Sequence, residues 1–311
     1  MENSRRKFLQ TLSMSSLILL ARQSSAWAMA DYRTSDNPFH LNYAPHFGMF
    51  RHSAGESLVD QITFMHERGF RSLEDNGMMS RSIKDQELIG STMAKLNMEM
   101  GVFVVNFDEW PLKTSLTSGN AEWRTKFLKS CKEAVEVAKR VNAKYMTVVP
   151  GNYDRSLSIG KQTGHVIDSL RMASDIFEPH GLSMVLEPLS DTPDLFLRYS
   201  DQTYMICRAV NSPACKILFD MWHMQRNEGQ MTKNMDSVWS EIGYFQIGDE
   251  PGRKEPTTGE VNYKFLFKHI YEKSKAANSS YILGMEHGNF FEGKEGEEKL
   301  IAAYRWCDDF L

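Results

Sequence analysis

Residues 243–263 read GYFQIGDEPGRKEPTTGEVNY, and this stretch joins an apolar strand to a long polar loop. Tyr244, Phe245 and Ile247 are aromatic or β-branched residues typical of a buried strand, and Gln246 stands among them. The loop continues with a Pro-Gly turn followed by an arginine. By composition alone it reads equally well as a functional loop or as a long connection.

The same unit, an apolar run followed by a helical stretch, recurs along the chain. The predicted strands span residues 40–45, 70–74, 100–106, 145–149, 182–186, 216–219, 243–247 and 281–285. The predicted helices span residues 57–68, 83–96, 121–141, 164–179, 201–210, 235–242, 265–276 and 296–310. Eight such units predict an α/β fold, a (β/α)₈ TIM barrel in one domain. A doubly wound open sheet is the alternative, but no GxGxxG follows the first strand.

The first 28 residues read as an export signal and not as part of the fold. Residues 4–10 (SRRKFLQ) precede an apolar region at 12–21, and residues 26–28 (AWA) offer a cleavage site after Ala28. The segment resembles a bacterial twin-arginine signal, which implies the twin-arginine export machinery as a partner and a periplasmic location. A basic amphipathic start on a cytoplasmic protein is the alternative. Residues 29–311 are predicted to form the barrel.

The composition argues against a nucleic-acid partner. Lys and Arg number 36 against 40 Asp and Glu, and the formal net charge is −4. The sequence shows no basic stripe of the kind that binds a phosphate backbone. The four cysteines show no CxxC spacing, which predicts free thiols, although an oxidised pair stays open in an exported protein. They are Cys131, Cys207, Cys215 and Cys307.

Each of the last four predicted strands ends on, or runs into, a residue that can bind a metal through oxygen. These residues are Glu187, Asp220, Gln246 and Glu286. The C-terminal ends of barrel strands converge on one face, so we expect the four side chains to meet there. Three carboxylates and an amide oxygen form a hard donor set, which predicts Mg²⁺ or Mn²⁺ rather than zinc or copper. A single residue of this kind at one strand end is more often a helix cap or a structural hydrogen-bond acceptor than a metal ligand.

Four motifs in the C-terminal half carry a resemblance to a known family. They are LEP at 186–188, FDMWHMQ at 219–225, FQIGDEPGRKEPTTGEVNY at 245–263 and GMEH at 284–287. Together they resemble the hydroxypyruvate isomerases of the xylose isomerase-like TIM-barrel superfamily, and the PGRxEPxTGExNY pattern is the most specific part. Ketose 3-epimerases share the four-ligand arrangement but usually have histidine where Gln246 stands.

The resemblance implies a metal-dependent isomerase that converts hydroxypyruvate to tartronate semialdehyde by proton transfer through an enediolate. The implied ligands of one divalent metal are Glu187, Asp220, Gln246 and Glu286. The implied proton-transfer pair is Glu187 and Glu286, since two carboxylates can serve as base and acid. The implied substrate contacts are His223 and Arg253, whose planar guanidinium suits a substrate carboxylate.

Other functions remain open from the sequence. A ketose or keto-sugar 3-epimerase would use the same two glutamates, and a non-catalytic periplasmic carbohydrate-binding barrel would keep only the pocket. A phosphodiesterase like the apurinic endonucleases would need several zinc ions and many histidine ligands, which this sequence does not offer. The resemblance implies a sugar or a keto-acid as the small-molecule partner, and the oligomeric state, a homo-oligomer included, is open.

Several side chains also have a purely structural interpretation. His223 could be hydrogen-bonded beneath the site, and Arg253 could pair with Glu250 or Glu255 to hold its loop. Glu74, after the second predicted strand, is either a further site residue or a surface acid.

Two residues at other predicted strand ends are candidate pocket walls or ordinary packing residues. They are His46 and Trp110.

Overall fold

The computed structural model describes residues 38–106 and 116–311. All paired strands within these residues are parallel. They form a seven-stranded sheet with the order β1-β9-β8-β7-β6-β5-β4 and a two-stranded sheet of β2 and β3. Their bounds are β1 (Asn42–Ala44), β2 (Ser72–Leu73), β3 (Glu99–Met100), β4 (Phe103–Asn106), β5 (Tyr145–Val148), β6 (Ser183–Leu186), β7 (Cys215–Asp220), β8 (Ile242–Gln246) and β9 (Ile282–Gly284).

The small sheet fills the gap between β1 and β4. The Glu74 amide donates to the carbonyl of Pro45 after β1, at 3.1 Å, and the Asp75 amide donates to the carbonyl of Val102 before β4, at 3.2 Å. Strands β3 and β4 together take the place of the single strand predicted at 100–106. The predicted α/β TIM barrel is thereby confirmed.

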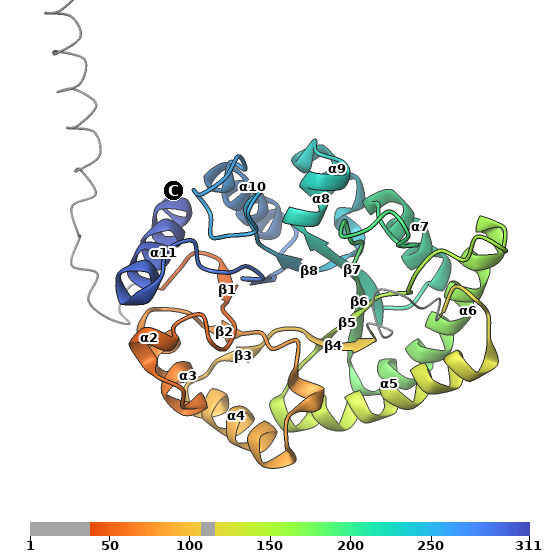
Figure 1. Ribbon diagram of the computed structural model, residues 1–311, viewed down its shortest axis with the longest axis horizontal. Coiled ribbons are helices and arrows are strands. Elements are labelled where there is room, and N and C mark those ends of the chain that lie inside the picture. Colours follow the sequence, from red (N-terminus) through yellow and green to blue (C-terminus); the bar gives the residue numbers. More distant parts are fainter. Residues whose placement is uncertain (1–37, 107–115) are drawn as a thin grey trace, which may run out of the picture. The chain divides into compact units, whose positions relative to one another are not determined.

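Helices lie around the outside of the strands (Figure 1). They are α2 (Arg51–Ala54), α3 (Leu58–Glu67), α4 (Ile83–Lys95), α5 (Ala121–Val141), α6 (Ile159–Phe177), α7 (Ser200–Val210), α8 (Met221–Asn227), α9 (Met231–Val238), α10 (Tyr263–Ala276) and α11 (Gly293–Asp308). Their apolar stripes pack on the sheet, as the buried Phe127, Ala134 and Val137 of α5 illustrate. Among the described residues, none of the helices has the length and apolar character that crossing a bilayer requires.

Two apolar layers hold the barrel together. The larger lies between strands and helices, and a smaller cluster fills the space among the strands themselves. The smaller cluster consists of Ala44, Val102, Val185, Leu218, Tyr244 and Ile282. The four cysteines are buried free thiols.

The helix boundaries differ from prediction in two informative places. Helix α6 begins at Ile159 and not at 164, because Gly160 and Gly164 weaken the helical signal of its first turns. Helix α8 was not predicted, since it has only seven residues and its first four are buried, so it reads as a continuation of β7.

Candidate active site

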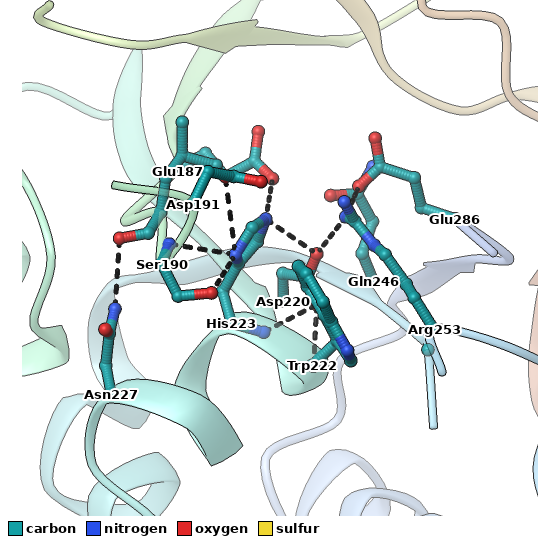
Figure 2. A network of polar contacts seen from close by, with 12 residues as sticks. Glu187, Ser190, Asp191, Asp220, Trp222, His223, Asn227, Gln246, Arg253 and Glu286 are labelled. Atoms are coloured by element: carbon teal, nitrogen blue, oxygen red, sulfur yellow. Dashed lines mark hydrogen bonds and ion pairs between the residues drawn. The ribbon is translucent and has the colours of Figure 1, made fainter. Parts of the chain in front are cut away.

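The four residues predicted to meet at the strand ends do lie on one edge of the sheet (Figure 2). Asp220 and Gln246 end β7 and β8 and face each other in register. Glu187 follows β6, and Glu286 follows β9. Asp220 is fully buried, Gln246 is 1% exposed and Glu187 is 5% exposed, so the cluster carries carboxylates in a poorly solvated place.

Asp220 organises the start of α8. Its Oδ1 accepts hydrogen bonds from the amides of Trp222 at 2.7 Å and His223 at 3.3 Å, as an N-cap does. This cap turns the short helix so that His223 Nε2 lies 3.6 Å from Asp220 Oδ2 and 3.7 Å from Glu187 Oε1. Burial by itself would raise the pKa of Asp220, but nearby His223 and Arg253 lower it, so this carboxyl is ionised.

The hydrogen bonds of His223 define which ring nitrogen carries the proton. The Ser190 amide donates to His223 Nδ1 at 3.0 Å, and an amide can only donate, so Nδ1 accepts. Burial lowers the pKa of His223 to about 4, which keeps the ring neutral at pH 7. The proton therefore sits on Nε2, which faces Glu187 and Asp220. In this arrangement Nε2 is a donor toward the site and not a free metal ligand.

Arg253 lies between two of the predicted metal ligands. Its Nη2 donates to Asp220 Oδ2 at 2.8 Å and to Glu286 Oε2 at 2.6 Å. The guanidinium also packs on the Trp222 ring, 4.4 Å from its centroid. Within the described residues it makes no ion pair with Glu250 or Glu255, the alternative partners that its sequence position suggested.

The two glutamates of the predicted proton-transfer pair stand on opposite sides of Asp220 in Figure 2. Burial raises the pKa of Glu286 to about 7, although Arg253 opposes the shift. Burial, and then the charge of Glu286, raise the pKa of Glu187 well above its usual value. Glu286 can thus hold or release a proton near neutral pH, and both carboxyls hold a proton more readily than an exposed glutamate does.

A second polar layer lies beneath Gln246. Glu74 is 1% exposed; its Oε2 accepts from the Tyr244 hydroxyl at 3.1 Å and faces Gln246 Nε2 at 3.5 Å. A Cβ on Gly284 would overlap this carboxylate, so the glycine of the GMEH motif makes room for Glu74. Glu74 is therefore a buried partner of the site and not a surface acid.

A family model described as the xylose isomerase-like TIM barrel matches residues 62–310. The chain belongs to this family. The chain is 31% identical to hydroxypyruvate isomerase from Escherichia coli over 181 residues, which are 57% of this chain and 65% of the relative. It is 34% identical to 2-oxo-tetronate isomerase from Pectobacterium atrosepticum over 125 residues, 40% of this chain and 46% of the relative. The chain thus matches less than two thirds of the length of these relatives.

Solved structures share the fold of this xylose isomerase-like chain. The 3-keto-D-glucoside 4-epimerase from Escherichia coli superposes with a TM-score of 0.71 at 17% identity, covering 86% of this chain and 100% of that one. A family 2 AP endonuclease from Brucella melitensis gives 0.70 at 19% identity, covering 82% and 96%. At these identities the two structures show the fold alone.

The residues of this xylose isomerase-like site fit a divalent cation. Glu187, Asp220 and His223 offer ligand atoms that all lie within 4.8 Å of one another. Gln246 Oε1 is buried and has no hydrogen-bond partner among the described residues, which suits a ligand oxygen. Because His223 Nε2 carries a proton, the better metal ligands are the carboxylates of Glu187 and Asp220 and the amide oxygen of Gln246.

Two contributors to the site carry no strong sequence signal. Asn76 Nδ2 donates to Glu286 Oε1 at 2.8 Å, and Ser190 fixes the His223 ring. Both follow strand ends closely, which is the one signal that marks them. His46 Nε2 lies 3.1 Å from the carbonyl of His287 and so supports the loop after β9, while Trp110 lies outside the described residues.

Proposed function

We propose that this protein is a metal-dependent isomerase of the hydroxypyruvate isomerase type, which moves a proton between adjacent carbons of an α-hydroxy carbonyl compound. The observation that carries the proposal is a pair of glutamates with raised pKa values, the buried Glu187 and the partly buried Glu286, on opposite sides of Asp220. A carboxyl on each side of a bound substrate can take a proton from one carbon and return one to the next.

The polar groups between the two glutamates suit the substrate's oxygens. His223 presents Nε2–H toward the centre because Ser190 occupies Nδ1. Arg253 presents a guanidinium, which binds a carboxylate through two parallel hydrogen bonds. In the structure this guanidinium donates instead to the carboxylates of Asp220 and Glu286. A three-carbon keto-acid such as hydroxypyruvate offers both a carbonyl to His223 and a carboxylate to Arg253.

The proposed cofactor is one Mg²⁺ or Mn²⁺ ion. Its proposed ligands are Glu187, Asp220, Gln246 and Glu286. When bound, such an ion stabilises the negative charge that develops on the substrate's oxygens. Arg253 now neutralises two of these ligands, so a cation would compete with its guanidinium for Asp220 and Glu286. That competition would free Arg253 to turn to the substrate.

The substrate class is supported by the relatives named hydroxypyruvate isomerase and 2-oxo-tetronate isomerase. A ketose or keto-sugar epimerase would use the same two carboxyls and differ only in where the proton returns. The proposed location is the periplasm, with residues 1–28 as a twin-arginine signal; this segment lies outside the described residues.

Incubation with Mg²⁺ or Mn²⁺ and a set of carbonyl compounds tests the proposal. Hydroxypyruvate, 2-oxo-tetronate and ketoses would each be followed by NMR for an isomerised or epimerised product. We expect conversion of at least one keto-acid, with loss of activity after chelation and recovery when the metal is restored. Conversion that is unaffected by chelation would contradict the metal requirement, and conversion of ketoses alone would favour the epimerase.

A further inference from the structure

Two side chains of α8 hold the two ends of one peptide group in the loop after β6. Asn227 Nδ2 donates to the carbonyl of Leu189 at 3.0 Å. The Ser190 amide, which belongs to the same peptide group, donates to His223 Nδ1 at 3.0 Å. Asn227 and His223 are four residues apart in α8, so they lie on one face of the helix, one turn apart. In Figure 2 both extend from the same helix, and Ser190 lies beside the His223 ring.

The amide of Asn227 has a single orientation that satisfies its neighbours. Its Nδ2 also donates to the carbonyl of Arg198 at 2.7 Å, and its Oδ1 accepts from Arg198 Nη2 at 3.1 Å. The opposite orientation would place an acceptor against two carbonyl oxygens and a donor against a guanidinium. Asn227 therefore presents a fixed donor to the Leu189 carbonyl.

The direction of this peptide group decides which nitrogen of His223 carries the proton. With the Ser190 amide toward Nδ1, that nitrogen must accept, and the proton lies on Nε2. If the peptide group were turned over, its carbonyl oxygen would face Nδ1, which would then have to carry the proton. The Ser190 hydroxyl lies 2.8 Å from Nδ1, but a hydroxyl can donate or accept and so suits either tautomer.

The two tautomers of His223 suit different tasks in the site. Nε2 lies 3.7 Å from Glu187 Oε1 and 3.6 Å from Asp220 Oδ2, the oxygens of two proposed metal ligands. A protonated Nε2 donates to a substrate oxygen. An unprotonated Nε2 presents a lone pair in the same place, and imidazole is a ligand that suits zinc, whereas carboxylate and carbonyl oxygens suit Mg²⁺ and Mn²⁺.

We infer that Asn227 is a positioning residue that keeps His223 a donor to the substrate and prevents it from becoming a metal ligand. It does so by holding the Leu189–Ser190 peptide group with its N–H toward Nδ1. The inference rests on the proposed function, in which His223 contacts the substrate and the metal has oxygen ligands. It adds that the preference for Mg²⁺ or Mn²⁺ over zinc depends on a residue outside the ligand set.

The ring nitrogens of His223 report the tautomer directly. The full chain, labelled with ¹⁵N-histidine, would be studied by long-range ¹H–¹⁵N NMR with and without Mg²⁺, in mildly alkaline buffer in which imidazole is neutral. The protonated and unprotonated nitrogens of a neutral ring have well-separated ¹⁵N shifts, and a spectrum of His223→Gln identifies the signals of His223. We expect the proton on Nε2. The spectrum requires no turnover, so the result does not depend on whether the isomerase proposal is correct.

Asn227→Asp keeps the size of the side chain but places an acceptor against the Leu189 carbonyl. We expect the peptide group to turn over and the proton of His223 to move to Nδ1. The ratio of zinc affinity to Mg²⁺ affinity, measured by calorimetry, should then rise at least about tenfold. A ratio removes the effect of the added negative charge, which acts on both divalent ions.

Asn227→Ala removes the donor without adding a charge. We expect both tautomers of His223 in this variant, because nothing then fixes the peptide group. Circular dichroism would check the fold of each variant, and Asn227→Ala decides the question if Asn227→Asp does not fold.

Two further variants serve as controls, and both should keep the proton on Nε2. Asn234→Asp on α9 removes a matched amide, whose Nδ2 donates to the carbonyl of Gly229 at 2.9 Å. Ser190→Ala removes the hydroxyl beside His223 but keeps the backbone amide. The inference is overturned if the unsubstituted protein has the proton on Nδ1, if both folded Asn227 variants keep it on Nε2, or if Ser190→Ala moves it. Absence of isomerase activity with the expected spectra would overturn the proposed function alone.

Discussion

The chemistry of single side chains depends here on the groups beside them more than on residue type. Glu187, Asp220 and Glu286 are carboxyls of one cluster, yet the pKa of Asp220 is lowered while burial raises those of the other two. Asp220 differs because it has His223 as well as Arg253 beside it and accepts hydrogen bonds from two backbone amides. One acid is thus kept charged while two can carry a proton, which is the division that proton transfer needs.

Replacement of either proposed proton-transfer residue should remove turnover. Glu187→Gln and Glu286→Gln keep the size of the side chain but cannot exchange a proton. We expect kcat to fall by about 10²–10⁴-fold, the usual contribution of a general acid or base. Steady-state kinetics would measure the loss and circular dichroism would check the fold. Glu133→Gln, at an exposed position of α5, is the matched control. Near-normal kcat in both variants would exclude the assigned roles.

Glu74 is expected to act through Gln246 by fixing the direction of its amide. Because Nε2 faces Glu74, Oε1 is left for the centre of the site. Glu74→Gln places a second amide opposite the amide of Gln246, so the direction of the Gln246 amide is no longer fixed. We expect Mn²⁺ binding to weaken by about 10–100-fold, as is common when a residue that orients a metal ligand is changed.

Calorimetry with Mn²⁺ measures this effect without an activity assay. Tyr244→Phe removes only the hydroxyl contact to Glu74 and should cost less affinity. Mn²⁺ affinity equal to that of the unsubstituted protein in Glu74→Gln would show that Glu74 does not orient the amide.

At the scale of elements, what the sequence reveals depends on how local the signal is. Strands β6 to β9 are apolar runs that end beside a polar residue, so both the strands and their end residues could be predicted. Helix α8 could not, since its apolar first turn resembles the strand before it. The burial of Glu74 could not either, because it depends on Gly284, which is distant in sequence and makes room for it.

Helices α9 and α10 are joined by an ion-pair cluster whose strength should depend on pH. Asp236 lies 2.8 Å from His269 Nε2 and 2.7 Å from Lys273 Nζ. Partial burial would raise the pKa of Asp236, but these partners lower it below its usual value. A lowered carboxyl pKa stabilises the fold above the pKa of the unfolded chain, and this stability is lost as pH falls through the folded pKa.

We therefore expect Asp236→Asn to destabilise the protein at neutral pH and to do so less in acid. The effect should be about 0.5 kcal/mol, since the Asp236 side chain is 44% exposed and solvent screens the pair. Urea unfolding of both proteins from neutral pH to acid below the ordinary pKa of an aspartate would measure it. A stability difference that stays constant or grows as pH falls would contradict the sign of this linkage.

At the scale of the whole molecule, the barrel brings segments that are far apart in sequence to one edge. Residues from the loop after β2 and from the ends of β6 to β9 meet there, so the site requires a closed and folded barrel. Such a site would suit the proposed twin-arginine route, because that route carries folded proteins and would allow a metal to be bound before export.

Replacement of the arginine pair tests the proposed export. Arg5→Lys with Arg6→Lys keeps the charge but removes the residues that the route recognises. We expect the doubly substituted protein to remain in the cytoplasm, with an unchanged barrel by circular dichroism. Cell fractionation and immunoblotting would measure the distribution. Equal amounts of both proteins in the periplasm would exclude a twin-arginine signal.

Deuterium exchange in D₂O is the most direct measurement of the proposed proton transfer. The Mn²⁺-loaded protein would be incubated with hydroxypyruvate, 2-oxo-tetronate and ketoses, and NMR would follow deuterium at each carbon. We predict deuterium at a carbon next to a carbonyl in at least one compound, and loss of that exchange in Glu187→Gln and Glu286→Gln. Absence of exchange into every compound, or exchange that persists in both variants, would contradict proton transfer by these two glutamates.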